Sequence, residues 1–443
     1  MPVSQCLAGL LVALVSGTVP LMAQSTEPAR LIPGATVERV VSSQDTTQSY
    51  AVFVPSGLDP RTPPPLLCVM DPRGRALMPL RLLRPAAERF GYVIFSSYNT
   101  RSDEPGDPNT AAVNAMIADA QRLLTIDTRR IYLVGFSGTA RAGWDYAYRL
   151  DGHVAGLLGF GAGFPPGWTP PVPAPGEPGT LVFYGGAGTT DFNYQEVQDL
   201  DAYLERRGIR HHVARYEGPH GWPPAWVMSD AVQWMELQAM RRGLAARDSA
   251  WIDSLYRTRS ASAAAAEAAG DGYAAYLGYR EVRADFAGLH DVGADSGRVV
   301  SLERTAQVRR TLEHRDEVAE RYRSDLARLQ RFIARTRQAA KPEELSRSLK
   351  ELQIARLKER AAETSDQIAA LGAAQSLEQI FVVTAFYEPR QALAGQNPAR
   401  ALAMLEIAEV IHPGAPFVCA SRKEALAAQG RMEEATALRC TFN

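Results

Sequence analysis

Up to about Gly243, the chain alternates short apolar runs with longer stretches that have the residue spacing of helices. Many of the apolar runs are continuous and rich in β-branched or aromatic residues, which is typical of strands buried on both faces. Strands that alternate with helices indicate βαβ units and a mostly parallel sheet covered by helices. The predicted strands are 49–55, 66–70, 92–96, 131–135, 154–161, 180–184 and 211–216, and the predicted helices are 79–90, 110–124, 139–150, 194–207 and 225–242. The segment 163–179 contains seven prolines and is predicted to be a loop.

After Gly243 the strand signal nearly vanishes, and Ala, Glu, Arg and Leu dominate. Within 305–337 the apolar residues recur mostly three or four apart, which predicts a long amphipathic helix. Pro342 breaks this pattern, and a second helix is predicted to begin near Glu343. Two long helices joined by a short break indicate an antiparallel hairpin.

The end of the chain contains a weak internal repeat. Gln391-Ala-Leu-Ala is followed 33 residues later by Glu424-Ala-Leu-Ala, and each copy is predicted to be a helix, a turn and a second helix. This spacing resembles that of tetratricopeptide repeats, whose period is about 34 residues. An ordinary helical bundle is the other interpretation of the same Ala-rich segment.

The first 23 residues carry no charged side chain and contain an apolar run at 6–15. The run is followed by small residues and Pro20, which predicts a secretory signal cleaved near Ala23, with an uncleaved anchor as the alternative. A membrane span needs about 18 or more apolar residues, so none is expected after the signal is removed. The expected location is therefore the periplasm or the exterior of the cell.

Three cysteines, Cys68, Cys419 and Cys440, would remain after removal of the signal. Cys68 lies in an apolar predicted strand and is expected to be a buried thiol. Cys419 and Cys440 lie on predicted neighbouring helices and could pair in an oxidising compartment. The formal net charge of the whole chain is −1, so nothing in the composition favours nucleic acid or an anionic membrane as a partner.

The sequence Gly135-Phe-Ser-Gly-Thr139 follows a predicted strand and precedes a predicted helix. A serine at such a tight strand-to-helix turn can be a nucleophile, and its neighbours two positions away must be small because strand and helix cross there. Gly135 meets this requirement, whereas Thr139 is larger and β-branched. Ser137 is therefore either a nucleophile or a serine in an ordinary tight turn.

Two later residues complete a chemical pattern. Asp191 follows a Gly-rich stretch after a late predicted strand, where a triad carboxylate or a helix N-cap would both fit. His220 lies on a Gly/Pro-rich loop after the last predicted strand, where it could reach back to Ser137 or simply face solvent. The order along the chain is Ser, Asp, His, the order of α/β-hydrolases.

On these motifs, GFSG at 135–138, GGAGTTDFNY at 185–194 and GPHGW at 218–222, the segment 37–243 resembles the α/β-hydrolases found among secreted esterases, polyester depolymerases and dienelactone hydrolases. The resemblance implies that Ser137 is the nucleophile, His220 the general base and then acid, and Asp191 the group that orients the imidazole. It also implies that the N–H of Gly138 donates to the oxyanion. The expected architecture is an α/β-hydrolase sheet flanked by helices, followed by an all-α C-terminal domain. The expected division is signal peptide 1–23, hydrolase domain 37–243, helical region with a long hairpin 245–376, and tetratricopeptide-like repeats 377–443.

The loop after the predicted strand 66–70 departs from the family pattern, since it begins with Asp71-Pro72. Pro72 has no N–H to offer, so the second oxyanion donor is expected from Arg73, with Gly74 as the alternative. Asp71 would repel an oxyanion unless a nearby arginine neutralised it. Further substrate-binding candidates are Arg75, Arg141 and Trp222; the arginines could bind a substrate carboxylate or be solvated surface charges.

The leading hypothesis is a secreted or periplasmic serine hydrolase that cleaves small carboxylic esters through Ser137, His220 and Asp191. No HExxH, CxxC, P-loop or dinucleotide-binding glycine motif occurs, so no metal and no cofactor are expected. One alternative is a catalytically impaired hydrolase-like scaffold whose helical C-terminal half binds a protein partner. Another is a binding protein for a small ester or carboxylate.

Overall fold

The computed structural model describes residues 31–440 except for 60, 103–105, 151–152, 171–180 and 340. The predicted signal peptide and most of the proline-rich segment 163–179 lie outside the described residues. All the elements below belong to one compact unit that begins at Leu31.

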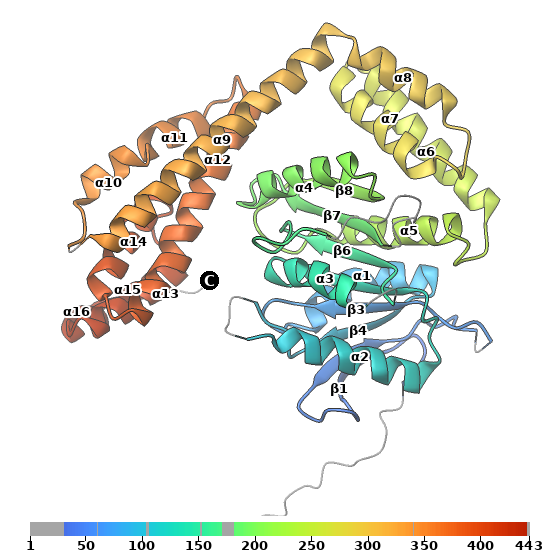
Figure 1. Cartoon of the computed structure of the whole chain (residues 1–443), viewed down its shortest axis with the longest axis horizontal. Helices are drawn as coiled ribbons and strands as arrows, with labels where there is room; N and C mark the ends of the chain where they lie inside the picture. The colour runs from blue at the N-terminus through green and yellow to red at the C-terminus, as the bar shows by residue number, and fades with distance from the viewer. Residues whose placement is uncertain are drawn as a thin grey trace, which may run out of the picture. The chain divides into compact units, whose positions relative to one another are not determined.

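An eight-stranded sheet forms the centre of the N-terminal half (Figure 1), with the strand order β1-β2-β4-β3-β5-β6-β7-β8. β2 pairs antiparallel with both β1 and β4, and all the other pairs are parallel. The strands are β1 Thr36–Val41, β2 Ser49–Phe53, β3 Leu66–Met70, β4 Val93–Ser97, β5 Ile131–Phe136, β6 Gly156–Phe160, β7 Val182–Gly188 and β8 His211–Tyr216. Seven of them match predicted strands. β1 was not predicted because half of the residues of this edge strand are exposed and it has no continuous apolar run.

Five helices cover the sheet: α1 Leu77–Phe90, α2 Pro108–Leu124, α3 Gly138–Arg149, α4 Tyr194–Arg206 and α5 Ala225–Arg241. α1 packs against α5, and α2 packs against α3. The strands β2 to β7 are buried along their length. Cys68 on β3 is among their buried residues, and burial raises the pKa of its thiol. Sheet order and covering helices are those of the α/β-hydrolase fold, as predicted.

The last part of β7 differs from the prediction, which ended this strand at Tyr184. The strand continues through Gly185 and Gly186 to Gly188. A Cβ atom on Gly185 would lie 2.2 Å from the Gly159 carbonyl oxygen, and one on Gly186 would lie 2.6 Å from the Ala214 carbonyl oxygen. These glycines therefore let neighbouring strands approach closely rather than forming a flexible loop.

The C-terminal half is helical, as predicted. Its helices are α6 Ser249–Ala268, α7 Gly272–Phe286, α8 Gly293–Glu303, α9 Ala306–Gln338, α10 Leu345–Glu351, α11 Ile354–Ala361, α12 Gln367–Val382, α13 Glu388–Ala394, α14 Pro398–Ile411, α15 Pro416–Ala428 and α16 Met432–Ala437, with a π-helical turn at Val383–Tyr387. The predicted long helix is α9, and its N-cap is the side chain of Thr305, which accepts a hydrogen bond from the Val308 N–H.

The predicted long hairpin is wrong in its second arm. The chain after α9 forms two short helices, α10 and α11, separated by Gln353 in the left-handed conformation with φ of 57°. The turn allows Leu352 and Ile354 on its two sides to be buried in the same core. α9 instead packs along α12. The predicted boundary at 376/377 falls inside α12.

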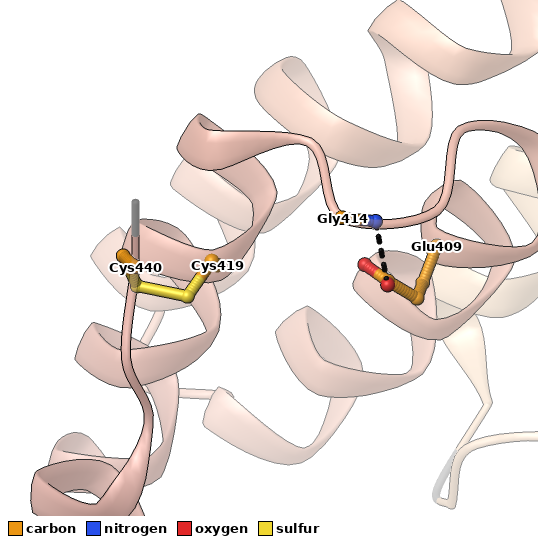
Figure 2. The surroundings of a disulfide bond; sticks show 4 residues. All are labelled: Glu409, Gly414, Cys419 and Cys440. Atoms are coloured by element: carbon orange, nitrogen blue, oxygen red, sulfur yellow. Dashed lines mark hydrogen bonds between the residues drawn. A yellow bond between two sulfur atoms is a disulfide. The ribbon is translucent and has the colours of Figure 1, made fainter. Parts of the chain in front are cut away.

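Two features of the last helices bear on the earlier predictions. Among the described residues, 367–394 is one helical run long and apolar enough to cross a membrane, but 56% of its most apolar window is buried within the fold. Cys419 on α15 forms a disulfide with Cys440, a pairing that the sequence left open, and Cys440 lies beyond the end of α16 rather than on a helix (Figure 2). The tetratricopeptide-like repeat stays a prediction.

Candidate active site

Ser137 lies at the sharp turn between β5 and α3, with φ of 55° and ψ of −128°. A non-glycine residue with positive φ is strained and is held there by its surroundings. The strand and the helix cross so closely that a Cβ atom on Gly135 would lie 2.6 Å from the Thr139 carbonyl oxygen. The predicted elbow therefore exists, and it requires the glycine at 135.

Thr139 was expected to weaken this elbow, but the structure accommodates it. Its side chain is fully buried, and its hydroxyl donates to the Met70 carbonyl at the end of β3, at 2.7 Å. The same hydroxyl accepts a hydrogen bond from the Phe136 N–H at 3.1 Å. Thr139 thus links the elbow to the neighbouring strand, and a methyl-sized side chain there would lose both bonds.

The structure brings Ser137, His220 and Asp191 together. Ser137 Oγ lies 3.0 Å from His220 Nε2, and His220 Nδ1 lies 2.8 and 2.9 Å from the two carboxylate oxygens of Asp191. A carboxylate can only accept, so Nδ1 carries the proton and Nε2 is free to accept from the serine hydroxyl. Asp191 is fully buried, and the Asn193 N–H also donates to it at 2.7 Å.

Two aromatic rings fix the position of the imidazole, and neither was predicted. The ring centroid of Phe192 lies 4.2 Å from that of His220, and the ring of Phe136 lies 4.7 Å away. Both residues directly adjoin a triad member in sequence, at positions 191 and 137. That adjacency was the one local signal that could have identified them.

The predicted oxyanion donors have different outcomes. Gly138 is the first residue of α3, so its N–H has no acceptor within the helix. The prediction that the Arg73 N–H is an oxyanion donor is wrong, because this N–H donates to the Asp71 carboxylate at 2.8 Å. The alternative, Gly74, donates its N–H to the Asp71 carbonyl oxygen at 3.0 Å. The Asp71 carboxylate thus accepts the Arg73 N–H, and the Asp71 backbone carbonyl accepts the Gly74 N–H, so both N–H groups are already bonded within this loop.

Asp71 itself is neutralised, as its environment requires for a fully buried carboxylate. Arg75 donates to both of its oxygens, at 3.1 and 2.9 Å, and Trp222 Nε1 donates to Oδ2 at 2.8 Å. Burial alone would raise the pKa of Asp71, but the hydrogen bonds from Arg75 and Trp222 outweigh it and hold the pKa below its usual range.

The substrate-binding candidates are largely engaged within the protein. The Arg75 head group is bound to Asp71, and Arg141 forms a bidentate pair with Glu196 and also donates to the Phe164 carbonyl oxygen. The sequence left open whether Arg75 and Arg141 bind a substrate carboxylate or are solvated surface charges; in the structure both head groups are paired with carboxylates of the protein itself. Trp222 packs its ring 5.5 Å from that of Phe136 and joins the His220 loop to the Asp71 loop.

Two of the hollows near the sheet bear on these candidates. One of about 420 Å³ is open beside Gly138 and is lined by Tyr146, Trp168 and charged side chains that include Arg149. A larger hollow of about 850 Å³ lies between α5 and the α6–α7 pair. Trp226 lines this hollow, and Ser137, Asp191 and His220 do not. Within the part of the chain that the structure describes, no group of three or more His, Cys, Asp or Glu side chains could hold a metal ion.

Comparison with known proteins gives matches only among solved structures. No protein-family model and no curated protein matches the sequence. One similar structure is FphF, the substrate-bound fluorophosphonate-binding serine hydrolase F of Staphylococcus aureus, with 14% identity and a TM-score of 0.38 over 46% of this chain and 98% of that chain. A second is a ferulic acid esterase, with 13% identity and a TM-score of 0.36 over 45% of this chain and 97% of that chain. A third is the Bacillus cereus carboxylesterase, with 15% identity and a TM-score of 0.35 over 44% of this chain and 95% of that chain.

Proposed function

We propose that this protein is a serine hydrolase that cleaves small carboxylic esters through an acyl-enzyme. One observation carries the proposal: the hydroxyl of Ser137, at a strained strand-to-helix elbow, lies 3.0 Å from His220 Nε2, whose ring is anchored by the buried Asp191. A nucleophile, a base and an orienting carboxylate within hydrogen-bond reach form the arrangement needed for acyl transfer.

In the acylation step, Ser137 Oγ attacks the ester carbonyl carbon while His220 Nε2 takes the hydroxyl proton. Asp191 stabilises the resulting imidazolium through its hydrogen bond to Nδ1–H. The Gly138 N–H, at the N-terminus of α3, donates to the oxyanion of the tetrahedral intermediate, where the helix dipole also favours negative charge. The intermediate then collapses, and His220 returns the proton to the departing alkoxide, so that an alcohol leaves.

In the deacylation step, His220 Nε2 takes a proton from a water molecule as that water attacks the acyl-enzyme carbonyl. The second tetrahedral intermediate expels Ser137 Oγ, which regains its proton from His220, and a carboxylic acid is released. Every group in this cycle is an amino-acid side chain or backbone N–H, so the proposed reaction needs no bound cofactor.

We also propose that the mature protein acts in the periplasm or outside the cell. The uncharged apolar N-terminus predicts export, and the disulfide between Cys419 and Cys440 fits an oxidising compartment. An impaired scaffold was weighed because of Thr139 and Asp71. The hydrogen bonds of Thr139 within the elbow and the pairing of Asp71 with Arg75 support the enzyme. The bond from the Arg73 N–H to Asp71 leaves Gly138 as the one assigned oxyanion donor and keeps the scaffold as the alternative.

The test is labelling of the mature wild-type protein by a fluorophosphonate probe, with hydrolysis of short p-nitrophenyl esters measured in parallel. Ser137→Ala and His220→Ala are expected to lose both labelling and turnover, with the circular dichroism spectrum of the wild type. Removal of a triad member typically lowers kcat by about 10⁴-fold or more. The matched controls are Ser346→Ala and His153→Ala, which replace exposed residues outside the triad and are expected to behave as the wild type.

A folded wild type that neither labels nor hydrolyses any of these esters would refute the proposal. Labelling that persists in Ser137→Ala would place the nucleophile elsewhere and refute the assigned triad.

A further inference from the structure

The loop that carries Asp191, residues 189–193 between β7 and α4, is held at its start by the helical half of the chain. Gln375 on α12 is buried, and its Nε2 donates to the Thr189 carbonyl oxygen at 2.7 Å. Its Oε1 accepts from Gln195 Nε2 at 2.9 Å. One amide side chain, 186 residues away in sequence from Thr189, therefore satisfies polar groups on both sides of the acid.

α9 holds the other end of the same loop. The hydroxyl of Tyr322 donates to the Phe192 carbonyl oxygen at 3.1 Å. Burial raises the pKa of Tyr322, so its hydroxyl keeps its proton and remains a donor at neutral pH. A second side chain of α9, Arg315, donates to the hydroxyl of Tyr194 at 3.1 Å.

The two carbonyl groups bound by the helical half, those of Thr189 and Phe192, lie two residues before Asp191 and one residue after it. Residues 31–243 hold the same loop as well, since the N–H groups of Thr189 and Thr190 donate to the Tyr216 and Gly218 carbonyl oxygens and Asn193 Nδ2 donates to the Gly161 carbonyl oxygen. The ring of Phe192 packs directly on that of His220. A shift of either carbonyl therefore moves Asp191 or Phe192, and both of these residues touch the imidazole.

We infer that Gln375 and Tyr322 are positioning residues for the Asp191–His220 pair, which makes the helical half a working part of the catalytic unit. The inference rests on the proposed hydrolase function. Gln375 and Tyr322 act through the loop and contribute no group to the triad or to its oxyanion donor, so their loss lowers kcat and leaves KM unchanged. The expected fall is about tenfold for each, the effect of one neutral hydrogen bond on a catalytic geometry.

The experiment uses the full mature chain with Gln375→Leu, Tyr322→Phe and the double variant. The matched control is Arg323→Gln, which breaks the exposed Arg323–Asp199 pair between α9 and α4, 3.0 Å long, without touching the loop. For each protein, kcat and KM for a p-nitrophenyl ester and the second-order rate of fluorophosphonate labelling are measured well below the melting temperature. Tyr322→Phe removes a single hydroxyl, so it carries the test if Gln375→Leu fails to fold.

The expected result is a fall of kcat and of the labelling rate in the loop variants, with an unchanged KM and with Arg323→Gln equal to the wild type. Wild-type kcat in both Gln375→Leu and Tyr322→Phe would overturn the inference, as would a raised KM with unchanged kcat. An equal loss in Arg323→Gln would also overturn it, because the effect would then belong to general docking of the helices. A wild type that does not label contradicts the proposed function itself, whereas a labelled wild type with unaffected loop variants contradicts only this inference.

Discussion

Replacement of Gly135 by alanine tests the idea that a close strand–helix crossing creates the serine elbow. The added Cβ would lie 2.6 Å from the Thr139 carbonyl oxygen and 2.7 Å from the Ala140 nitrogen and the Thr139 carbonyl carbon. All three atoms are backbone atoms of the first turn of α3, so no side-chain rotation can relieve the contact. The separation must open by several tenths of an ångström before it reaches even the shortest distances that real Cβ atoms adopt.

Overpacking of this kind costs about 1–3 kcal/mol of the free energy of unfolding. For a domain of this size the melting temperature is expected to fall by roughly 2–4 °C for each kcal/mol. The displacement also acts on Ser137 Oγ, two residues away, whose distance of 3.0 Å to His220 Nε2 leaves little tolerance. We therefore expect Gly135→Ala to lower both the melting temperature and the rate of fluorophosphonate labelling.

Calorimetry and labelling kinetics measure the two effects, with Gly297→Ala as the matched control. Gly297 is exposed in α8, and a Cβ there would meet nothing within 4 Å. Alanine in a helix interior is favoured over glycine by about 1 kcal/mol, so this control should be equally or more stable. A Gly135→Ala protein with the melting temperature and labelling rate of the wild type would refute the argument from backbone proximity.

Two further predictions concern stability. Replacing Cys419 and Cys440 by serine is expected to destabilise the C-terminal helices by about 3 kcal/mol, the chain-entropy value for a cross-link across 21 residues, as measured by urea unfolding; an unchanged midpoint would contradict it. Burial alone would lower the pKa of His212, but the charge and hydrogen bond of Asp285, itself also paired with Arg259, outweigh burial and raise the pKa. A raised histidine pKa stabilises the fold fully below the unfolded value of about 6.5, and this stabilisation is lost as the pH rises through the folded value. The melting temperature of the wild type minus that of His212→Gln should therefore become smaller as the pH rises above 6.5. A difference that does not vary with pH would contradict a raised pKa of His212 beside Asp285.

Local patterns were sufficient for most of the hydrolase fold. The buried strand 66–70 has a continuous apolar sequence, and its predicted bounds match those of β3. The pattern of apolar residues was less informative where a strand is partly exposed or where one residue interrupts a helix. β1 was missed because half of its residues are exposed and it has no continuous apolar run. The hairpin arm after Glu343 was overextended because a single left-handed residue, Gln353, interrupts an otherwise helical sequence.

The candidate triad was accessible from the sequence because its members follow recognisable local motifs, and the order of Ser137, Asp191 and His220 along the chain restricts how they can meet. The interactions of their neighbours were not accessible in this way. Arg73 was expected to offer its N–H to an oxyanion, but the side chain of Asp71 folds back and accepts that hydrogen. The direction in which an aspartate side chain folds is decided by its tertiary partners, here Arg75 and Trp222.

The sequence by itself determined the α/β alternation, the helical second half and the three candidate residues for acyl transfer, because each of these depends on local spacing and on residue type. Only the tertiary structure decided that Trp222 bonds to a carboxylate 151 residues away and that Gln375 bonds to the loop of the candidate acid 186 residues away. Such bonds join segments whose own sequences satisfy no special pattern. Their geometry arises from the packing of whole helices on the sheet, which no short stretch of sequence specifies.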